Sequence, residues 1–158
     1  MPPMQLVDLD ALDLNSLQLG PDEIRAVNPH RHEMELLTGI IRFAPEEGFI
    51  VGELQLAEDA FWVRGHIPGR PIFPGVLMVE AAAQLCSYYW RATFDQPDRF
   101  FGFGGIRDTR FRGTVTPGER LIIAGKVVNL RPRRAIFDTQ GFVDGTMVFE
   151  SQIIGMPV

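Results

Sequence analysis

The order of apolar and polar residues in the first half of the chain is typical of paired strands. Residues 49–56 alternate in character, with Ile50 and Leu54 on one face and Glu53 on the other, as in a half-buried strand. Residues 36–43 are equally rich in branched and aromatic side chains. The two segments predict a β-hairpin.

The middle of the chain follows a different pattern. Residues 76–93 contain no proline or glycine and are apolar on nearly every side, which predicts a buried central helix. The ten residues before them, 66–75, contain three prolines and two glycines and are expected to form a rigid loop. A short helix is expected over residues 22–27.

The last third of the chain is strand-like. Turn signals at Thr116-Pro117-Gly118 and Asp144-Gly145 punctuate it. The strands are expected at residues 100–106, 110–115, 121–130, 135–143 and 147–154. One long helix and a run of hairpin-joined strands imply an α+β fold, in which an antiparallel sheet curls around the helix.

Length and composition favour one domain. A chain of 158 residues with 46% hydrophobic content builds one core. Residues 1–20, where leucines alternate with aspartates, are interpreted as an N-terminal extension to a domain spanning residues 21–158. The extension lacks the basic flank of a signal peptide.

Charge and cysteine content exclude several classes of function. The net charge of −5, spread along the chain, argues against nucleic acid as a partner. The single cysteine, Cys86, excludes an internal disulfide and favours the cytoplasm. No uncharged stretch reaches the ~20 apolar residues of a membrane-spanning helix, so no membrane partner is expected.

One carboxylate stands alone in the predicted central helix. Glu80 is the only charged residue from Pro71 to Trp90. Burial without a cationic partner favours the neutral acid, so Glu80 is a candidate proton donor near neutrality. Gln84, one helical turn on, could orient it. The alternatives are a glutamate that faces a solvent gap and a plain amide at the edge of the core.

The loop before this helix adds a base and backbone donors. His66 opens the loop, and imidazole is the side chain best suited to take a proton at physiological pH. The amides of Gly75 and Val76, at the expected helix start, could stabilise a carbonyl oxygen that gains negative charge. A structural histidine and an ordinary helix cap are the alternatives.

The segment Gly65-His66-Ile67-Pro68-Gly69-Arg70-Pro71-Ile72-Phe73-Pro74-Gly75-Val76-Leu77, continuing to Glu80 and Gln84, resembles the signature of the FabZ-type (3R)-hydroxyacyl-acyl-carrier-protein dehydratases, relatives of FabA. The histidine and the carboxylate are fourteen positions apart, as in that family. Asn28-Pro29-His30-Arg31 and Val115-Thr116-Pro117-Gly118 also resemble family segments. Residues 32–39 depart from the pattern, which bears on substrate choice.

The resemblance implies a hotdog fold and dehydration of a (3R)-hydroxyacyl thioester, with no metal or other cofactor. It implies that His66 abstracts a proton beside the thioester carbonyl, that Gly75 and Val76 hold the oxyanion, and that Glu80 protonates the departing hydroxyl. It also implies a homodimer in which His66 and Glu80 of one site come from opposite protomers. A trimer of dimers is a further possibility.

The substrate's chain and its carrier need separate surfaces. Phe73, Met78, Phe101 and Phe103 are candidates to line an acyl tunnel, with ordinary core packing as the alternative. An acidic acyl carrier protein could dock on basic residues. Two arginine groups are candidates for that contact: Arg107, Arg110 and Arg112, or Arg131, Arg133 and Arg134.

Two other functions remain open at this point. A hotdog acyl thioesterase would bind a similar substrate but hydrolyse it, and a non-catalytic acyl-binding subunit would carry out no reaction. The remaining motifs are weak: His30 and His32 lack a third metal ligand nearby and are interpreted as structural or surface residues. Cys86 and Ser87 lack the sequence pattern of a catalytic nucleophile.

Overall fold

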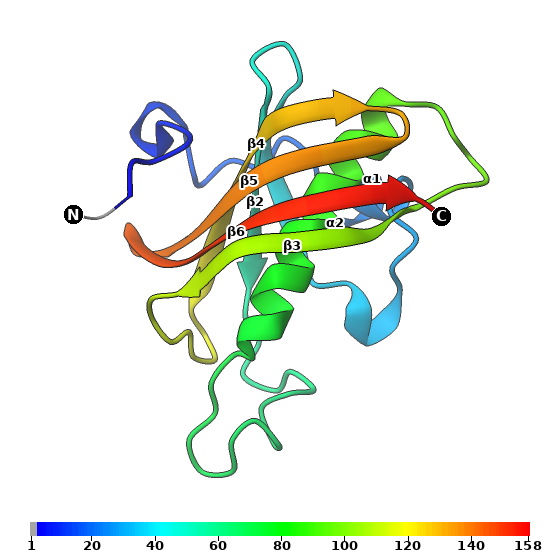
Figure 1. Cartoon of the computed structure of the whole chain (residues 1–158). Helices are drawn as coiled ribbons and strands as arrows, with labels where there is room; N and C mark the ends of the chain where they lie inside the picture. The colour runs from blue at the N-terminus through cyan, green and yellow to red at the C-terminus, as the bar shows by residue number, and fades with distance from the viewer. Residues whose placement is uncertain (1–2) are drawn as a thin grey trace.

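A computed structural model describes residues 3–158 and shows one antiparallel sheet curled around one long helix (Figure 1). The helix is α2, Gly75–Thr93. The sheet has the strand order β1-β2-β4-β5-β6-β3. Its strands are β1 (Gly39–Ala44), β2 (Phe49–Gln55), β3 (Phe101–Phe111), β4 (Arg120–Arg131), β5 (Arg134–Val143) and β6 (Thr146–Pro157). This architecture confirms the expected hotdog fold.

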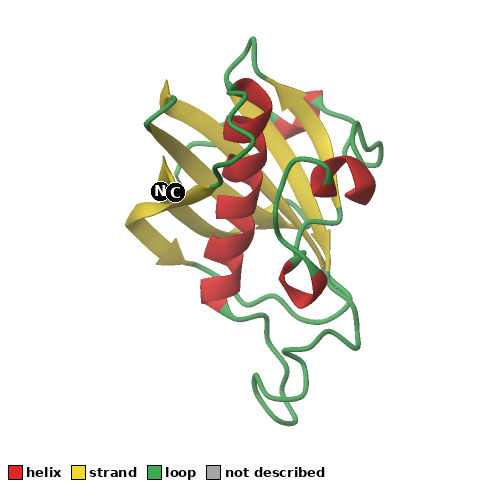
Figure 2. Cartoon of the chain, turned by 90° about the vertical axis from the view of Figure 1, so that its right-hand side faces the viewer, coloured by secondary structure: helices red, strands yellow, loops and turns green. Residues whose placement is uncertain are grey.

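The central helix lies against the concave face of the sheet (Figure 2). Ala81, Leu85 and Trp90 are fully buried, because the sheet and the loops cover the helix on several sides. The helix approaches β2 closely at Gly52, where an added Cβ would lie 2.7 Å from Leu85 Cδ1. Glycine at this position permits the close packing, and the predicted buried helix is confirmed.

The outer face of the sheet is also partly buried, by the chain's own beginning. Val7 and Leu9, the latter in the short 3-10 helix η1 (Leu9–Ala11), pack on Val51. Further contacts on this face come from Ile41, Ile122, Ala124 and Phe142. Alternation along β2 indicated only one buried face, but the leucine-rich segment covers the second face as well. The domain boundary after residue 20 stays a prediction.

The structure corrects two of the expected strands. Residues 100–106 and 110–115 do not form separate strands, because β3 runs unbroken from Phe101 to Phe111 with irregular pairing between Arg107 and Arg110. Asp108 in this stretch has a positive φ of 49°. A bulge of this kind absorbs extra residues without ending the strand.

The first helix and the first strand differ from their predicted ranges only at their ends. The helix expected over residues 22–27 is α1, Pro21–Arg25. The first strand starts at Gly39 rather than at residue 36. The chain before it includes the 3-10 helix η2, His32–Met34, and crosses α2 instead of joining the sheet.

The two edges of the sheet differ. The β1 edge is partly covered, because Leu19 and Ile40 exchange two backbone hydrogen bonds. The outer edge of β3, eleven residues long, has no strand beside it among residues 3–158. Within the same range, no helix is long and apolar enough to cross a membrane.

Candidate active site

The loop that precedes α2 holds His66 in one orientation. Its backbone amide donates to the carbonyl of Trp62, and its own carbonyl accepts from the amide of Ile72. The ring nitrogen Nδ1 lies 2.8 Å from the carbonyl oxygen of Ile72. Since a carbonyl only accepts, Nδ1 carries the hydrogen, and Nε2 of the neutral ring keeps a free lone pair. His66 therefore presents a base at Nε2.

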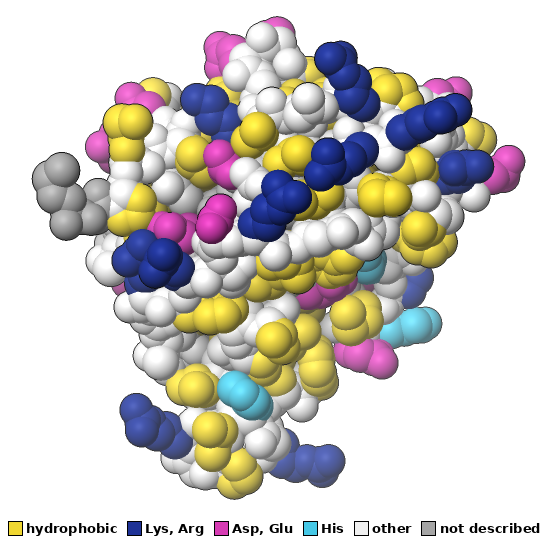
Figure 3. Space-filling model, in the orientation of Figure 1, with side chains coloured by type: hydrophobic (Ala, Val, Ile, Leu, Met, Phe, Trp, Pro, Cys, Tyr) yellow, Lys and Arg dark blue, Asp and Glu magenta, His cyan; other side chains and the backbone are white. Residues whose placement is uncertain are grey.

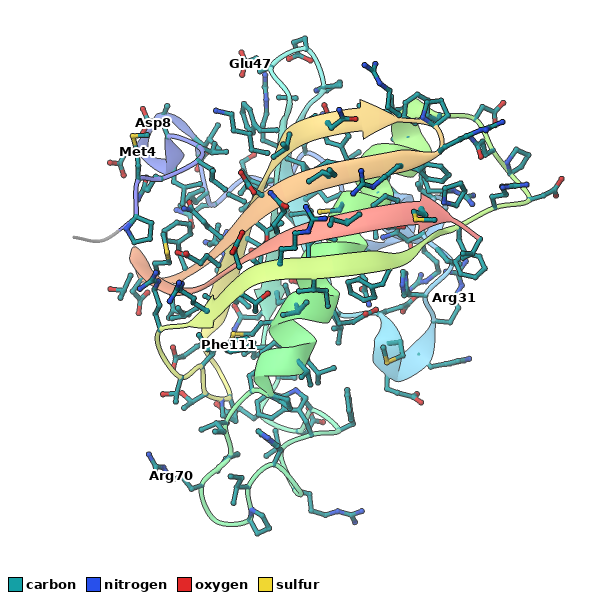
Figure 4. All side chains as sticks on the ribbon, in the orientation of Figure 1. Met4, Asp8, Arg31, Glu47, Arg70 and Phe111 are labelled. Carbon is teal, nitrogen blue, oxygen red and sulfur yellow. The ribbon has the colours of Figure 1, made fainter. Side chains whose placement is uncertain are left out.

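The start of α2 presents backbone donors beside this loop. Pro74 is the N-cap residue and no side chain caps the helix, so the amides of Gly75 and Val76 have no acceptor within it. The ring of Phe111 packs against Gly75, where an added Cβ would lie 3.0 Å from Cε1 of the ring. Figure 4 shows Phe111 beside the lower end of α2, and Arg70 on the loop that precedes this helix.

Glu80 lies in the second turn of α2 and has two side-chain partners. Its Oε1 accepts a hydrogen bond from Gln84 Nε2 at 3.0 Å and lies 3.6 Å from Nε2 of His30. The carboxylate is about one-fifth exposed. An imidazole from a distant part of the sequence thus stands beside the carboxylate, a neighbour that the local sequence pattern did not indicate.

Gln84 fixes this arrangement and is not a plain amide at the core edge. Besides Glu80, its Nε2 donates to the carbonyl of Met34 at 2.8 Å, and its Oε1 accepts from the amide of Leu36 at 3.3 Å. The backbone carbonyl of Gln84 accepts from Asn28 Nδ2 at 2.9 Å. The segment before β1 is therefore pinned across the face of α2 that carries Glu80.

His30 is the functional candidate that sequence reasoning missed. Burial lowers its pKa below the usual histidine value, the negative charge of Glu80 raises it, and the positive charge of Arg31 lowers it. Its ring nitrogen Nδ1 is buried without a hydrogen-bond partner, and so is Oδ1 of Asn28. The available signal was the Asn28-Pro29-His30-Arg31 segment of the family resemblance, in which the sequence pattern indicated only a structural or surface role for His30.

The structure does not join His66 and Glu80 within one protomer. No hydrogen bond or ion pair between them occurs among residues 3–158, and each has its own partners.

Burial raises the pKa of the Cys86 thiol, so a thiolate nucleophile is disfavoured there. No group of three metal-ligating side chains occurs in the described part of the chain.

The four residues expected to line an acyl tunnel lie in different places. Phe73 packs on Trp62 and lines a cavity that also borders Leu36, Leu54 and Phe61. Met78 is buried in the core. Phe101 packs on Trp90 and Phe137 at the other end of α2, and Phe103 is half exposed on β3. Of the four, only Phe73 borders this cavity.

Residues 28–152 match the model of the FabA-like domain, and the chain belongs to this family. Solved structures that share the fold include the following three. The dehydratase heterocomplex ApeI:P from Xenorhabdus doucetiae is 18% identical over 85% of this chain and 90% of that one, with a TM-score of 0.72. A mutant thioesterase from Pseudomonas aeruginosa is 14% identical over 98% and 96%, with a TM-score of 0.66. A hypothetical thioesterase with coenzyme A from Streptococcus pneumoniae is 10% identical over 75% and 84%, with a TM-score of 0.58.

Proposed function

We propose that the protein dehydrates a (3R)-hydroxyacyl thioester on acyl carrier protein to the trans-2-enoyl thioester, in the biosynthesis of fatty acids or of related lipids or polyketides. The observation that carries this proposal is the hydrogen bond from His66 Nδ1 to the carbonyl of Ile72. It leaves Nε2 as a base whose orientation the loop sets. Family membership and the hydrogen-bonded carboxyl group of Glu80 support it.

The proposed reaction uses three groups. His66 Nε2 takes the proton from the carbon next to the thioester carbonyl, and the electron pair left behind forms an enolate. The amides of Gly75 and Val76 donate to the enolate oxygen. As the carbonyl re-forms and the carbon–carbon double bond appears, the carbon–oxygen bond of the hydroxyl breaks, and Glu80 gives its proton to the departing oxygen. The products are the enoyl thioester and water.

We infer that the proposed site draws on a second copy of the chain, since no hydrogen bond or ion pair joins His66 to Glu80 among residues 3–158. The open edge of β3 is suited to that contact, since an unpaired strand edge is a template for pairing. Phe103, Ile106 and Phe111 on this strand are about half exposed, and Val76 at the helix start is more so. Figure 3 shows apolar side chains gathered along and below this edge. We infer a homodimer whose two sites combine residues of both protomers.

We infer that the acyl chain enters the cavity that is lined in part by Phe73, a residue of the loop that also carries His66. Its walls include Leu36, Leu54, Trp62 and Phe73, and His32, Glu33, Glu35 and Thr38 also line it. Most of the segment that departs from the FabZ-type pattern thus borders this cavity. We infer that these residues influence which acyl chain fits.

The carrier protein would dock on exposed arginines. Arg112 is engaged by Glu150 at 3.2 Å, whereas Arg131, Arg133 and Arg134 lie exposed at the tight β4–β5 hairpin. Lys and Arg side chains are also visible over the outer face of the sheet (Figure 3). Changing Arg133 and Arg134 to Glu is expected to raise KM for the carrier-bound substrate but not for a short pantetheine thioester.

A direct assay separates dehydration from hydrolysis, the reaction of the thioesterases that share this fold. The purified protein is incubated with a 3-hydroxyacyl thioester while enoyl absorbance and free thiol are both followed. Enoyl product without thiol is expected, and thiol without enoyl product would reject the proposal. Glu80→Gln should lower the rate by roughly 100-fold or more. The matched control Glu47→Gln, in the distant β1–β2 turn labelled in Figure 4, should not.

A further inference from the structure

Positive charge gathers in a cleft formed by residues 25–31, the last turn of α2 and the segment before β3. The walls of this cleft carry four arginines, Arg25, Arg31, Arg91 and Arg99, and one acidic residue, Asp98. Its volume is about 550 Å³. We propose that the cleft binds a phosphate-bearing ligand.

Three of the four arginines have no carboxylate to neutralise them. Arg25 is paired with two carboxylates of its own neighbourhood. The other three take part in no ion pair among residues 3–158, and neither does Asp98. Like charges that share one cleft repel one another, and the protein as a whole carries a net charge of −5. The excess of positive charge is therefore local, and a bound anion would relieve it.

The guanidinium groups are partly fixed in place and still keep hydrogen-bond donors free. Arg31, labelled in Figure 4, donates to three backbone carbonyls of its own segment, so two of its five N–H groups remain. Arg91 donates from Nη1 to the carbonyl of Arg99, which leaves four. The side chain of Arg99 donates to no group in the described part of the chain. The cleft thus offers donors on guanidinium groups that the backbone already holds, which lowers the entropy cost of binding.

Phosphate fits this arrangement better than a carboxylate does. A carboxylate has two oxygens and one negative charge, whereas a phosphate group has at least three acceptor oxygens and, as a monoester, up to two negative charges. Three guanidinium groups can therefore share one phosphate, each through the paired N–H groups that suit it. The ring of Phe100, half exposed at the wall of the cleft, offers apolar surface to the rest of the ligand.

The cleft is separate from the groups of the proposed reaction. Gly75 lies in the first turn of α2 and Arg91 in its last, so about 24 Å of helix separates them at a rise of ~1.5 Å per residue. A phosphate held here is not part of a thioester that reacts at Gly75 of the same protomer. The inference therefore goes beyond the proposed dehydration and does not depend on it. Two sources share the chemistry: the phosphate of a carrier protein's prosthetic group, and a free phosphorylated small molecule.

Binding can be measured without any enzyme assay. Inorganic phosphate is titrated into the protein at low salt while the arginine Nε–H signals are followed by NMR. Saturable binding with a Kd on the order of 1 mM is expected. Arg99→Gln removes a guanidinium group that holds no other part of the chain, and it should weaken binding about tenfold. The matched control is Arg42→Gln, on β1 and outside the cleft, which should change the Kd less than about twofold.

Two further comparisons complete the test. Arg91→Gln should weaken binding as Arg99→Gln does, and far-UV circular dichroism checks that each variant is folded. Signals that do not saturate, or the same Kd in the wild type and in both cleft variants, would overturn the inference.

The source of the phosphate is decided with pantetheine 4′-phosphate as a second probe. Binding at least about tenfold tighter than that of inorganic phosphate assigns the cleft to a carrier's prosthetic group, and an equal Kd assigns it to free phosphate. Either result upholds the inference. Arginine-dependent binding of a carrier protein that lacks its prosthetic group, with no response to either phosphate probe, would reject it in favour of an acidic protein surface.

Discussion

Nδ1 of His66 and the carbonyl oxygen of Ile72 lie 2.8 Å apart across the loop that precedes α2. The contact fixes the tautomer of the neutral ring and ties the first residue of the proline-rich segment to Ile72. Nδ1 thus holds the loop, and Nε2 of the neutral ring keeps the free lone pair that the proposed catalytic role requires.

The composition of the proposed site can be tested by mixing two inactive variants. His66→Gln and Glu80→Gln should each be almost inactive alone. If the two residues of a site come from opposite protomers, subunit exchange at equal concentrations should restore about a quarter of the wild-type rate, because half of the dimers are mixed and each has one intact site. If both residues act within one protomer, mixing restores nothing. The measurement is enoyl formation after co-refolding.

The β3 edge should control assembly. Ile106→Lys places a charge in the middle of the proposed contact, where about half of the side chain is exposed in the single chain. The variant should sediment as a monomer and lose activity, since burying an unpaired charge is unfavourable. Val128→Lys, an equally exposed apolar position on β4, is the matched control and should remain dimeric. Two monomeric variants, or two dimeric ones, would contradict the assignment of the edge.

The effect on stability of replacing Gly75, at the start of α2, should depend on the ring of Phe111 beside it. Gly75→Ala introduces a Cβ about 3.0 Å from Phe111 Cε1, so the ring must move and the free energy of unfolding should fall by about 1 kcal/mol. In a Phe111→Ala background the same change should be almost neutral. A double-mutant cycle by urea denaturation measures the coupling, and additive effects would show that the contact carries no energy.

The depressed pKa of His30 should make stability depend on pH. A histidine that binds a proton less readily in the folded chain than in the unfolded chain costs stability as the pH falls below its unfolded value of about 6.5. The free energy of unfolding should therefore decrease more steeply between pH 7 and pH 5 in the wild type than in His30→Gln. The measurement is urea denaturation at several pH values, and parallel curves would contradict the shift.

The central helix and most strands followed from the sequence because their signals are local. An apolar run without proline or glycine indicated α2, and turn residues marked the hairpins. The bulge in β3 was not predicted, since irregular pairing depends on the register with β6. The same limit applies to Val51, whose burial depends on a segment more than forty residues earlier in the chain.

The residues of the proposed site also fall into those that the local sequence indicated and those that it did not. His66, Gly75 and Glu80 stand in one continuous stretch, so their association with a loop and a helix start could be inferred directly. His30 reaches Glu80 only because residues 28–36 cross the helix, and this crossing depends on hydrogen bonds from Gln84 to Met34 and Leu36. Contacts between segments fifty residues apart leave no local pattern.

The N-terminal segment that covers the outer face of the sheet has a consequence for larger assemblies. Val7 and Leu9 cover apolar side chains of β1, β2, β4 and β5 that would otherwise be free to pack against another sheet. Any assembly of dimers must therefore meet through other surfaces or first displace this segment. Residues 6–14, as they lie in the structure, thus close the outer face of the sheet to stacking between copies of the protein.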